Sequence, residues 1–393
     1  MIPVAEALAR VLALAPPPVP EEVSLDAAAG RVLLQPAVAR LTQPPFDAAA
    51  MDGYALRAPD LPGPLSVIGQ AAAGHPWPGQ ARPGTAVRIF TGAPVPAGYD
   101  RVVMQENCVR DDDFVTVTDM SGGTNIRLRG NDFAEGDPVA APRLIRPADL
   151  GLLAAMNVAR VTVARRPRVA VIASGDELVR PGADLAPGQI VSSNDLVVAA
   201  LAQEAGAEAI RLPIARDTEE SLRETFAAAG NADLIVTIGG ASVGDHDLVG
   251  KVASELGLDR AFYKIAMRPG KPLMAGRLGS AAMLGLPGNP VSSYVCSILF
   301  MQPLIRAMQG LPAAHRVLRA RLGADLPAEG ARQHYLRARL EPGPDLPVIT
   351  ASDDQDSARL TVLANADALL IRSAGDPARA RGDLVDYLPL GAS

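Results

Sequence analysis

Residues 168–177 read Arg-Val-Ala-Val-Ile-Ala-Ser-Gly-Asp-Glu, an apolar run that ends in small and acidic residues. Such a run is typical of a strand that is buried on both faces of a parallel sheet. Similar strand runs occur at 208–214, 233–238, 261–265 and 282–286, and helical patterns alternate with them at 194–205, 218–229, 247–256 and 290–308. This alternation indicates βαβ units, so we expect a doubly wound α/β domain over residues 167–312. Asn194 and Thr218 are expected to cap their helices.

The chain on either side of this domain has a different pattern. Residues 60–140 carry short apolar pieces between Gly, Pro and Asp turns, which predicts a β-rich lobe over 39–138. Helical stretches at 3–15 and 147–156 flank the lobe, and we expect them to pair in one elongated, discontinuous domain made of 1–38 and 139–166. Short strands predict a small C-terminal β domain over 313–393. The expected fold class is therefore multidomain α/β.

The overall composition excludes several classes of protein. The chain has 37 Lys and Arg against 43 Asp and Glu, a net charge of −6, which argues against a surface that coats nucleic acid or an anionic membrane. Its two cysteines, Cys108 and Cys296, support neither a disulfide scaffold nor a thiolate zinc site. No uncharged apolar run approaches the roughly 20 residues that cross a bilayer. We therefore expect a cytoplasmic protein with no nucleic-acid or membrane partner.

Lysine is rare and unevenly placed. The chain has three lysines, Lys251, Lys264 and Lys271, all within one window of 21 residues, whereas the rest of its 37 Lys and Arg positions are arginines. The spacing is either an accident of an Arg-rich composition or a sign of compact ammonium groups that face a phosphate. The motifs around it favour the second interpretation.

A glycine-rich segment follows the strand predicted at 233–238. It reads Gly239-Gly240-Ala241-Ser242-Val243-Gly244 and continues as Asp245-His246-Asp247. The ligands of an α/β sheet bind beyond the carboxyl ends of its strands, where glycines let backbone N–H groups approach a phosphate and Ser242 adds a hydroxyl. The segment matches neither G-x-G-x-x-G nor a P-loop, so neither of those sites is supported. A simple turn remains the alternative.

Two further loops are stiffened by proline. Met267-Arg268-Pro269-Gly270-Lys271-Pro272 holds two cations, with Lys264 four residues before Arg268, and rigid cations suit a pyrophosphate or an oxyanion. Leu286-Pro287-Gly288-Asn289-Pro290 joins a strand to a helix, and Asn289 can donate hydrogen bonds there. Either loop alone is equally well explained as a turn. Because the three loops end consecutive strands of the predicted sheet, we expect them to form one site.

Carboxylates also follow strands of this sheet. Glu177, Asp217 and Asp247 would line one rim if the strands are parallel. Mg²⁺ takes one or two carboxylates together with phosphate oxygens, so these acids beside the cations predict a magnesium site. Each acid alone is better explained by a helix cap or a solvated surface. The histidines never occur at i, i+4, and no Ser or Cys has a nearby catalytic partner in the sequence. The sequence therefore gives little support for a histidine–metal site or a catalytic triad.

Six motifs follow one another along nearly the whole chain. They are Met51-Asp52-Gly53-Tyr54-Ala55, Thr91-Gly92-Ala93-Pro94, Ser174-Gly175-Asp176-Glu177, Gly239-Gly240-Ala241-Ser242-Val243-Gly244, Pro269-Gly270-Lys271-Pro272 and Leu286-Pro287-Gly288-Asn289-Pro290. This order resembles the molybdopterin molybdenumtransferase family, which includes MoeA and the gephyrin E domain. The resemblance implies an elongated four-part subunit with a MogA-like α/β domain, a dimerising linker domain and a small C-terminal β-barrel. It also implies a homodimer that inserts molybdate into adenylylated molybdopterin and releases AMP, aided by Mg²⁺.

The resemblance also assigns roles by position. The functional acids correspond to Asp52, Asp132, Glu177, Asp217 and Asp247, the last three as metal ligands, and Thr91, Lys264 and Lys271 match as well. Substrate contacts fall on Gly239, Gly240, Ser242, Gly244, Arg268, Pro287, Gly288, Asn289 and Pro290. Where many members have lysine, this chain has Arg268, whose planar fork replaces a point donor. The site is implied to lie between subunits, with Asp52, Thr91 and Asp132 facing the α/β domain of the partner subunit.

The implied partners are a molybdopterin adenylyltransferase, which supplies the substrate, and the molybdoenzymes that receive the cofactor. Two other functions stay open. An adenylyltransferase is one, because that family shares the α/β domain, although the β-rich lobe argues against it. A gephyrin-like scaffold that binds a partner peptide through its terminal domain is the other.

Overall fold

The computed structural model describes residues 1–239 and 248–391. Contacts divide the chain into two compact units, which are described separately below. Unit 1 consists of Met1–Glu21, Gly30–Val32 and Ala164–Ser393, and unit 2 consists of Glu22–Ala29 and Leu33–Val163.

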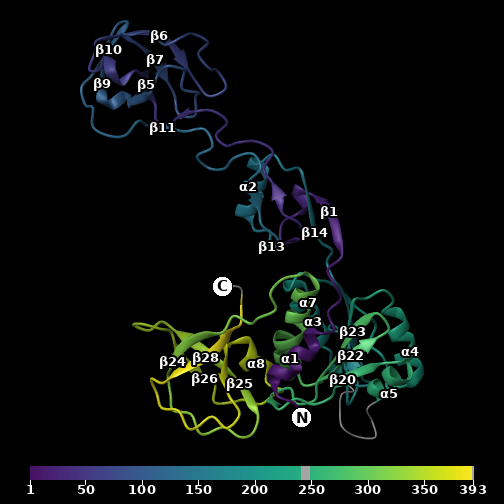
Figure 1. Cartoon of the computed structure of the whole chain (residues 1–393). Helices are drawn as coiled ribbons and strands as arrows, with labels where there is room; N and C mark the ends of the chain where they lie inside the picture. The colour runs from purple at the N-terminus through teal and green to yellow at the C-terminus, as the bar shows by residue number, and fades with distance from the viewer. Residues whose placement is uncertain (240–247, 392–393) are drawn as a thin grey trace. The chain divides into compact units, whose positions relative to one another are not determined.

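A six-stranded sheet in the order β18-β15-β19-β23-β22-β20 forms the centre of the α/β domain of unit 1 (Figure 1). Its strands are β15 (Arg168–Ala173), β18 (Glu208–Arg211), β19 (Leu234–Ile238), β20 (Asp259–Phe262), β22 (Met274–Leu278) and β23 (Ala281–Leu286). The first four strands in the sheet order are parallel, as predicted. β22 is antiparallel to both of its neighbours and was not predicted, because Gly276 and Arg277 interrupt its apolar pattern.

Helices cover both faces of this sheet, which confirms the doubly wound α/β domain. They are α3 (Asn194–Glu204), α4 (Glu219–Ala228), α5 (Leu248–Glu255), α6 (Pro290–Cys296), a π-helical turn (Ser297–Met301) and α7 (Gln302–Met308). One apolar core holds α3, α6 and α7, and a second holds α4 and α5. Thr218 caps α4 by accepting from the Ser221 N–H, as predicted. Asn194 does not cap α3: it is the first helical residue, and its side chain instead donates to the Gly288 carbonyl, 2.6 Å away.

The N-terminal helix α1 (Val4–Leu12) packs within unit 1. Its buried residues Val4, Ala7 and Val11 recur at helical spacing and join the core that contains α7. We expected this helix to pair with the stretch at 147–156. That stretch forms α2 (Pro147–Ala155), which belongs to unit 2. The apolar stripe of α1 predicted a buried helix, but such a stripe does not specify its partner.

The segment Pro290–Met308 is apolar and long enough to cross a membrane by length and composition, with 19 residues and a mean hydropathy of 1.3. From the sequence we expected no such segment. In the structure 72% of this segment is buried inside the fold, so it is a core helix of unit 1. Pro303 lacks the N–H that an α-helix would direct to the Leu299 carbonyl. His315 Nε2 donates to that carbonyl instead, at 3.1 Å.

A closed β-barrel forms the C-terminal part of unit 1 and confirms the predicted small β domain. Its strands are β24 (Leu318–Leu322), β25 (Gln333–Glu341), β26 (Val348–Ala351), β27 (Ala368–Arg372) and β28 (Leu384–Pro389), with the short helix α8 (Leu360–Ala364). The sheet order closes because β25 pairs with both β26 and β27. A short strand, β21 (Met267–Arg268), pairs in parallel with β25 and joins the barrel to the α/β domain.

Unit 2 is built from short strands, as predicted for the lobe. Its six-stranded sheet has the order β8-β5-β7-β6-β10-β9, with β5 (Gly53–Leu56), β6 (Leu65–Ala71), β7 (Thr85–Ile89), β8 (Arg101–Met104), β9 (Cys108–Asp111) and β10 (Phe114–Val117). The remaining strands are β1 (Pro20–Ser24), β2 (Val32–Leu33), β3 (Ala37–Val38), β4 (Ala48–Ala49), β11 (Ile126–Arg127), β12 (Pro138–Val139), β13 (Arg143–Leu144), β14 (Arg160–Ala164) and, in unit 1, β16 (Leu178–Val179) and β17 (Ile190–Val191). A separate core around Leu33, Leu153 and Val163 packs beneath α2.

Candidate functional site

Three loops meet at the carboxyl-end edge of the α/β sheet. β15, β19 and β23 all end there, as parallel neighbours must. β20 also ends at this edge, and β22 begins there, because Phe262 pairs with Ala275 and Met274 pairs with Gly285. The loop with Arg268 and Lys271 is therefore at the predicted edge. It differs from the prediction in joining β20 to an antiparallel strand.

Glycines allow the central loops to approach closely. Gly239 has φ +92°, and a Cβ built on it would lie 3.0 Å from the Ser174 carbonyl oxygen. A Cβ on Gly288 would lie 3.7 Å from the Gly239 Cα atom. The ends of β15, β19 and β23 thus converge here, and any larger residue at Gly239 would be strained. The predicted site residues Gly240, Ser242, Gly244 and Asp247 lie outside the described residues.

An acidic corner, defined here as Asp176, Glu177 and Asp217, follows β15 and β18. The backbone N–H of Asp217 donates to Asp176 Oδ1 at 3.3 Å, and the Asp176 N–H donates to Asp217 Oδ2 at 3.4 Å. The Glu177 carboxylate lies against Gly175, where a Cβ would be 2.5 Å from Glu177 Oε2. The structure therefore brings Glu177 and Asp217 to one corner of the edge. Sequence reasoning passed over Asp176, although it stands in the same motif.

The predicted metal set is described only in part. Glu177 and Asp217 are in place, whereas Asp247 lies outside the described residues. Within 1–239 and 248–391, no group of three or more His, Cys, Asp or Glu side chains is arranged to hold a metal ion. The described chain therefore places two of the three predicted metal ligands, Glu177 and Asp217, at this corner beside Asp176.

A cavity of about 610 Å³ lies between the cationic loop and the barrel. We call it the loop–barrel cavity. Its lining comes from the loop (Met267, Arg268, Pro269, Gly270, Lys271, Pro272), from α6 (Ser292) and from the barrel (Arg332, Asp353, Gln355, Asp356, Ser357). Arg268 is fixed by strand pairing, because it stands opposite His334 in the β21–β25 register. Three cationic residues, Arg268, Lys271 and Arg332, thus line the cavity against two acids, Asp353 and Asp356, and its positive side chains can bind an oxyanion.

The Pro287–Pro290 loop, at the start of α6, is held from two sides. Asn289 Nδ2 donates to the Ser357 hydroxyl at 3.1 Å, and the Val291 N–H donates to the Ser357 carbonyl at 3.0 Å. On the other side, Asn194 bonds Gly288. From the sequence we did not predict Ser357 and Arg332, because both lie in loops of the barrel, and a loop sequence carries no signal of what it faces.

The three lysines have three different surroundings. Lys251 is exposed and pairs with Glu219 on the neighbouring helix α4. Lys264 Nζ lies 5.6 Å from the centre of the Tyr263 ring. Lys271 lines the loop–barrel cavity, and its carbonyl accepts from the Ile265 N–H at 3.0 Å. Proximity in sequence therefore does not place the three ammonium groups in one site.

In unit 2, Asp52 and Thr91 form a pair. Asp52 Oδ1 accepts from both the Thr91 N–H and the Thr91 hydroxyl, each at 2.7 Å. These hydrogen bonds, the backbone one first, hold the pKa of Asp52 below its usual value. Asp132 lies in a different loop of the same unit, where its backbone N–H donates to Gln43. The structure thus brings Asp52 and Thr91 together and keeps the pair exposed.

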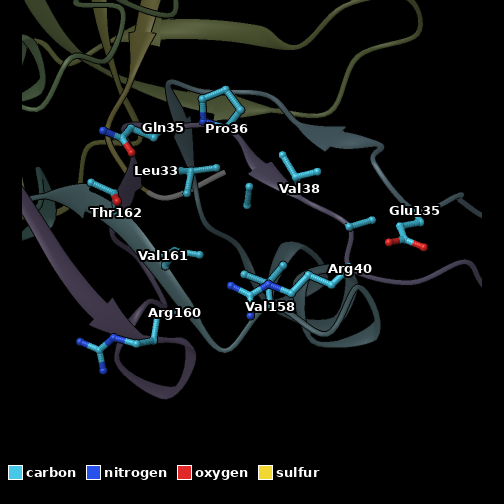
Figure 2. A pocket seen from close by; sticks show the side chains of 12 residues that line it. Leu33, Gln35, Pro36, Val38, Arg40, Glu135, Val158, Arg160, Val161 and Thr162 are labelled. Atoms are coloured by element: carbon cyan, nitrogen blue, oxygen red, sulfur yellow. The ribbon is translucent and has the colours of Figure 1, made fainter.

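A second cavity, of about 400 Å³, lies in unit 2 (Figure 2). Leu33, Val38, Val158 and Val161 contribute its apolar lining. Charged side chains also border it: Arg40, Glu135 and Arg160. None of the predicted site residues lines this cavity.

Three family models match the chain in succession. They are described as the MoeA N-terminal region (domain I and II), over residues 2–157; the probable molybdopterin binding domain, over 170–307; and the MoeA C-terminal region (domain IV), over 319–390. Together they cover the lobe, the α/β domain and the barrel.

Individual proteins resemble the chain over most of its length. A molybdopterin molybdenumtransferase of Nostoc sp. is 37% identical, covering 94% of this chain and 89% of the relative. One of Haemophilus influenzae is 38% identical, covering 79% of this chain and 78% of the relative. The crystal structure of a molybdopterin biosynthesis MoeA protein from Pyrococcus horikosii superimposes with a TM-score of 0.84 at 29% identity, covering 100% of both chains.

Proposed function

This chain belongs to the MoeA family of molybdopterin molybdenumtransferases, transferases of molybdenum cofactor biosynthesis, and we propose that it inserts molybdate into adenylylated molybdopterin and releases AMP. The observation that carries this proposal is the loop–barrel cavity, which Arg268, Lys271 and Arg332 line. A tetrahedral oxyanion needs fixed positive donors of this kind. The alternative adenylyltransferase and scaffold functions have no comparable support.

The chain's own groups account for the chemistry by positioning. Arg268 and Lys271 sit on a loop that is tied at both ends, through β21 and through the Ile265–Lys271 hydrogen bond. Their charges offset the repulsion between molybdate and the phosphates of the nucleotide-bearing pterin, and preorganised charges need no rearrangement during the reaction. No nucleophilic side chain of the protein is required.

We also expect Mg²⁺ to bind at the acidic corner. Glu177 and Asp217 follow neighbouring strands and supply carboxylates at one corner, which is the donor type that Mg²⁺ takes together with phosphate oxygens. The bound ion would neutralise phosphate charge. Asp247, in the helix-side end of the glycine-rich segment, is the third predicted ligand.

The test is to combine the protein with Mg²⁺, molybdate and adenylylated molybdopterin, and to follow AMP release and cofactor formation. We expect AMP release that depends on molybdate. Release that is unaffected by molybdate, or ATP-dependent adenylylation of free molybdopterin, would contradict the proposal.

We further propose a homodimer with a shared site, which the family resemblance implies. We expect Asp52, Thr91 and Asp132 of unit 2 to serve the α/β domain of the partner subunit. Mixing the impaired variants Asp52→Asn and Lys271→Ala should then raise activity above that of either variant alone, because a hybrid dimer regains one complete site. If subunits exchange and activity does not rise, each subunit carries its own complete site.

The cytoplasm is the expected location, with a molybdopterin adenylyltransferase as supplier and molybdoenzymes as recipients. Burial raises the pKa of the Cys108 thiol to about 11, and it also raises the pKa of the fully buried Cys296 thiol, so both thiols stay protonated and unreactive in a reducing compartment. Cell fractionation and co-purification with the adenylyltransferase test these expectations.

A further inference from the structure

Arg337, on β25, is completely buried in the barrel wall, with 0% of its surface exposed. It binds one segment of chain, the stretch after β26, through both its backbone and its side chain. Its N–H donates to Gln355 Oε1 at 3.0 Å, and its carbonyl accepts from Gln355 Nε2 at 3.0 Å and from the Ser352 N–H at 2.9 Å. Its guanidinium Nη2 donates to the Asp356 carbonyl at 3.0 Å.

This segment is one wall of the loop–barrel cavity. Gln355, Asp356 and Ser357 all line the cavity, and Ser357 in turn bonds Asn289 and the first turn of α6. A continuous set of hydrogen bonds therefore runs from Arg337 through Gln355 and Asp356 to the cavity wall and the start of α6. Moving Arg337 would move that wall.

Burying a guanidinium costs free energy of folding unless its N–H groups have hydrogen-bond partners, and the guanidinium of Arg337 is incompletely paired. Its Nε and Nη1 atoms are buried and have no hydrogen-bond partner in the part of the chain that the structure describes. Burial lowers the pKa of Arg337, the Asp354 carboxylate raises it, the positive charge of Arg268 lowers it and the Asp356 carboxylate raises it. Two of these neighbours, Arg268 and Asp356, line the loop–barrel cavity, so Arg337 is electrostatically coupled to the cavity wall.

We propose that Arg337 is a positioning residue for oxyanion binding: its buried side chain and backbone fix the Ser352–Ser357 wall of the loop–barrel cavity. The inference rests on the proposed function of that cavity. It assigns no contact between Arg337 and the substrate. Its consequence is that loss of Arg337 should weaken molybdate binding more than it slows turnover at saturating molybdate.

The barrel offers a matched control in Arg372. This arginine, on β27, is 1% exposed and also has a buried guanidinium nitrogen without a partner among the described residues. It pairs with the Asp376 carboxylate and with the carbonyls of Pro327 and Pro377. None of these three residues lines the loop–barrel cavity. Removing either arginine should therefore cost similar stability, and only one should affect the cavity.

The experiment compares Arg337→Met, Arg337→Lys and Arg372→Met in the full-length protein. AMP release gives KM for molybdate and kcat, and the rise of melting temperature on adding molybdate gives a measure of binding that does not depend on turnover. We expect Arg337→Met to raise KM about tenfold, with a smaller change in kcat. Arg337→Lys keeps the charge without the fork and should fall between Met and the wild type. Arg372→Met should leave KM unchanged at a similar loss of melting temperature.

Two outcomes separate this inference from the function on which it rests. Lys271→Ala, measured alongside, should also raise KM for molybdate. If Lys271→Ala raises KM while both Arg337 variants have the same KM as Arg372→Met, Arg337 has no positioning role, and the cavity is still the oxyanion site. If Lys271→Ala leaves KM unchanged, the cavity is not the oxyanion site, and the proposed role of Arg337 is wrong as well. Should Arg337→Met not fold, Arg337→Lys decides by the same comparison.

Discussion

The two ends of one sheet edge carry opposite charge. Along the order β18-β15-β19-β23-β22-β20, the acidic corner follows the first two strands, and the cations of the loop–barrel cavity stand between the last two. The glycine at the end of β19 lies between them. In the proposed function, the acidic corner is the expected place for a metal ion and the loop–barrel cavity the expected place for the oxyanion, so the two charges are bound at different ends of the edge.

The two ends also differ in how they are built. The acidic corner is made by turns that immediately follow two strands and bond each other. The cationic end needs a second wall, supplied by barrel residues such as Arg332 and Ser357. Substitutions at the cationic end should therefore act on oxyanion binding, and those at the acidic corner on metal dependence.

The largest expected effect is that of Lys271→Ala. Removing a charge-assisted hydrogen bond costs about 1.5–3 kcal/mol, so kcat/KM for molybdate should fall roughly 10- to 100-fold with the fold intact. Lys251→Ala is the control, because Lys251 is exposed and engaged with Glu219. Steady-state AMP release measures both variants. If both variants lose the same activity, the cationic end has no special role compared with the exposed Lys251.

Asp217→Asn tests the acidic corner. The amide keeps the shape and can still accept from the Asp176 N–H, but it removes one negative charge. We expect half-maximal activity to need about tenfold more Mg²⁺, with KM for molybdate little changed. Glu224→Gln, on the exposed surface of α4, makes the same charge change away from the edge and should have no effect. A lower melting temperature with an unchanged Mg²⁺ requirement would show that Asp217 is structural only.

This difference in construction also explains what the sequence could predict. The position of the acidic corner could be predicted, because an apolar run such as Val169–Ala173 indicates a buried strand. The residues just after such a run must lie at the end of that strand. Thr218 was likewise correctly read as a cap, because capping is local. Asn194 has the same capping chemistry, yet Gly288, 94 residues away, takes its hydrogen bond.

For the cationic end, the sequence predicted only the loop that carries Arg268 and Lys271. Pro269 and Pro272 indicated a rigid loop, but nothing local indicated that Arg332 or Ser357 would face it. The helix α1 shows the same limit, since its stripe of Val4, Ala7 and Val11 predicts burial and leaves the partner open. Long-range packing sets these contacts, and a single sequence carries no local signal for it.

His315→Ala should weaken the connection between the α/β domain and the barrel. His315 supplies the donor that Pro303 cannot supply to the Leu299 carbonyl. Its loss leaves that carbonyl without its partner and should cost about 1 kcal/mol, because His315 is only partly buried. Calorimetry should show the melting temperature of unit 1 lowered by about 2–4 °C. Adding Pro303→Ala, which restores a backbone N–H in the helix, should recover part of the loss; no recovery would contradict this account of His315.

The smallest expected effect is a response of the cationic end to mild acid. His334 stands opposite Arg268 in the β21–β25 register, and burial lowers its pKa below 6.5 despite the hydrogen bond to Glu329. The unfolded chain therefore binds this proton at a higher pH than the folded chain does, so stability is lost as pH falls below about 6.5 toward the folded pKa. Asp52 behaves differently: its lowered pKa preserves its contribution until pH falls below 3.8. The test is to measure the melting temperature between pH 7.5 and 5.5. It should decline less in His334→Asn than in the wild type. An equal decline in both would show that His334 does not make the stability of the barrel depend on pH.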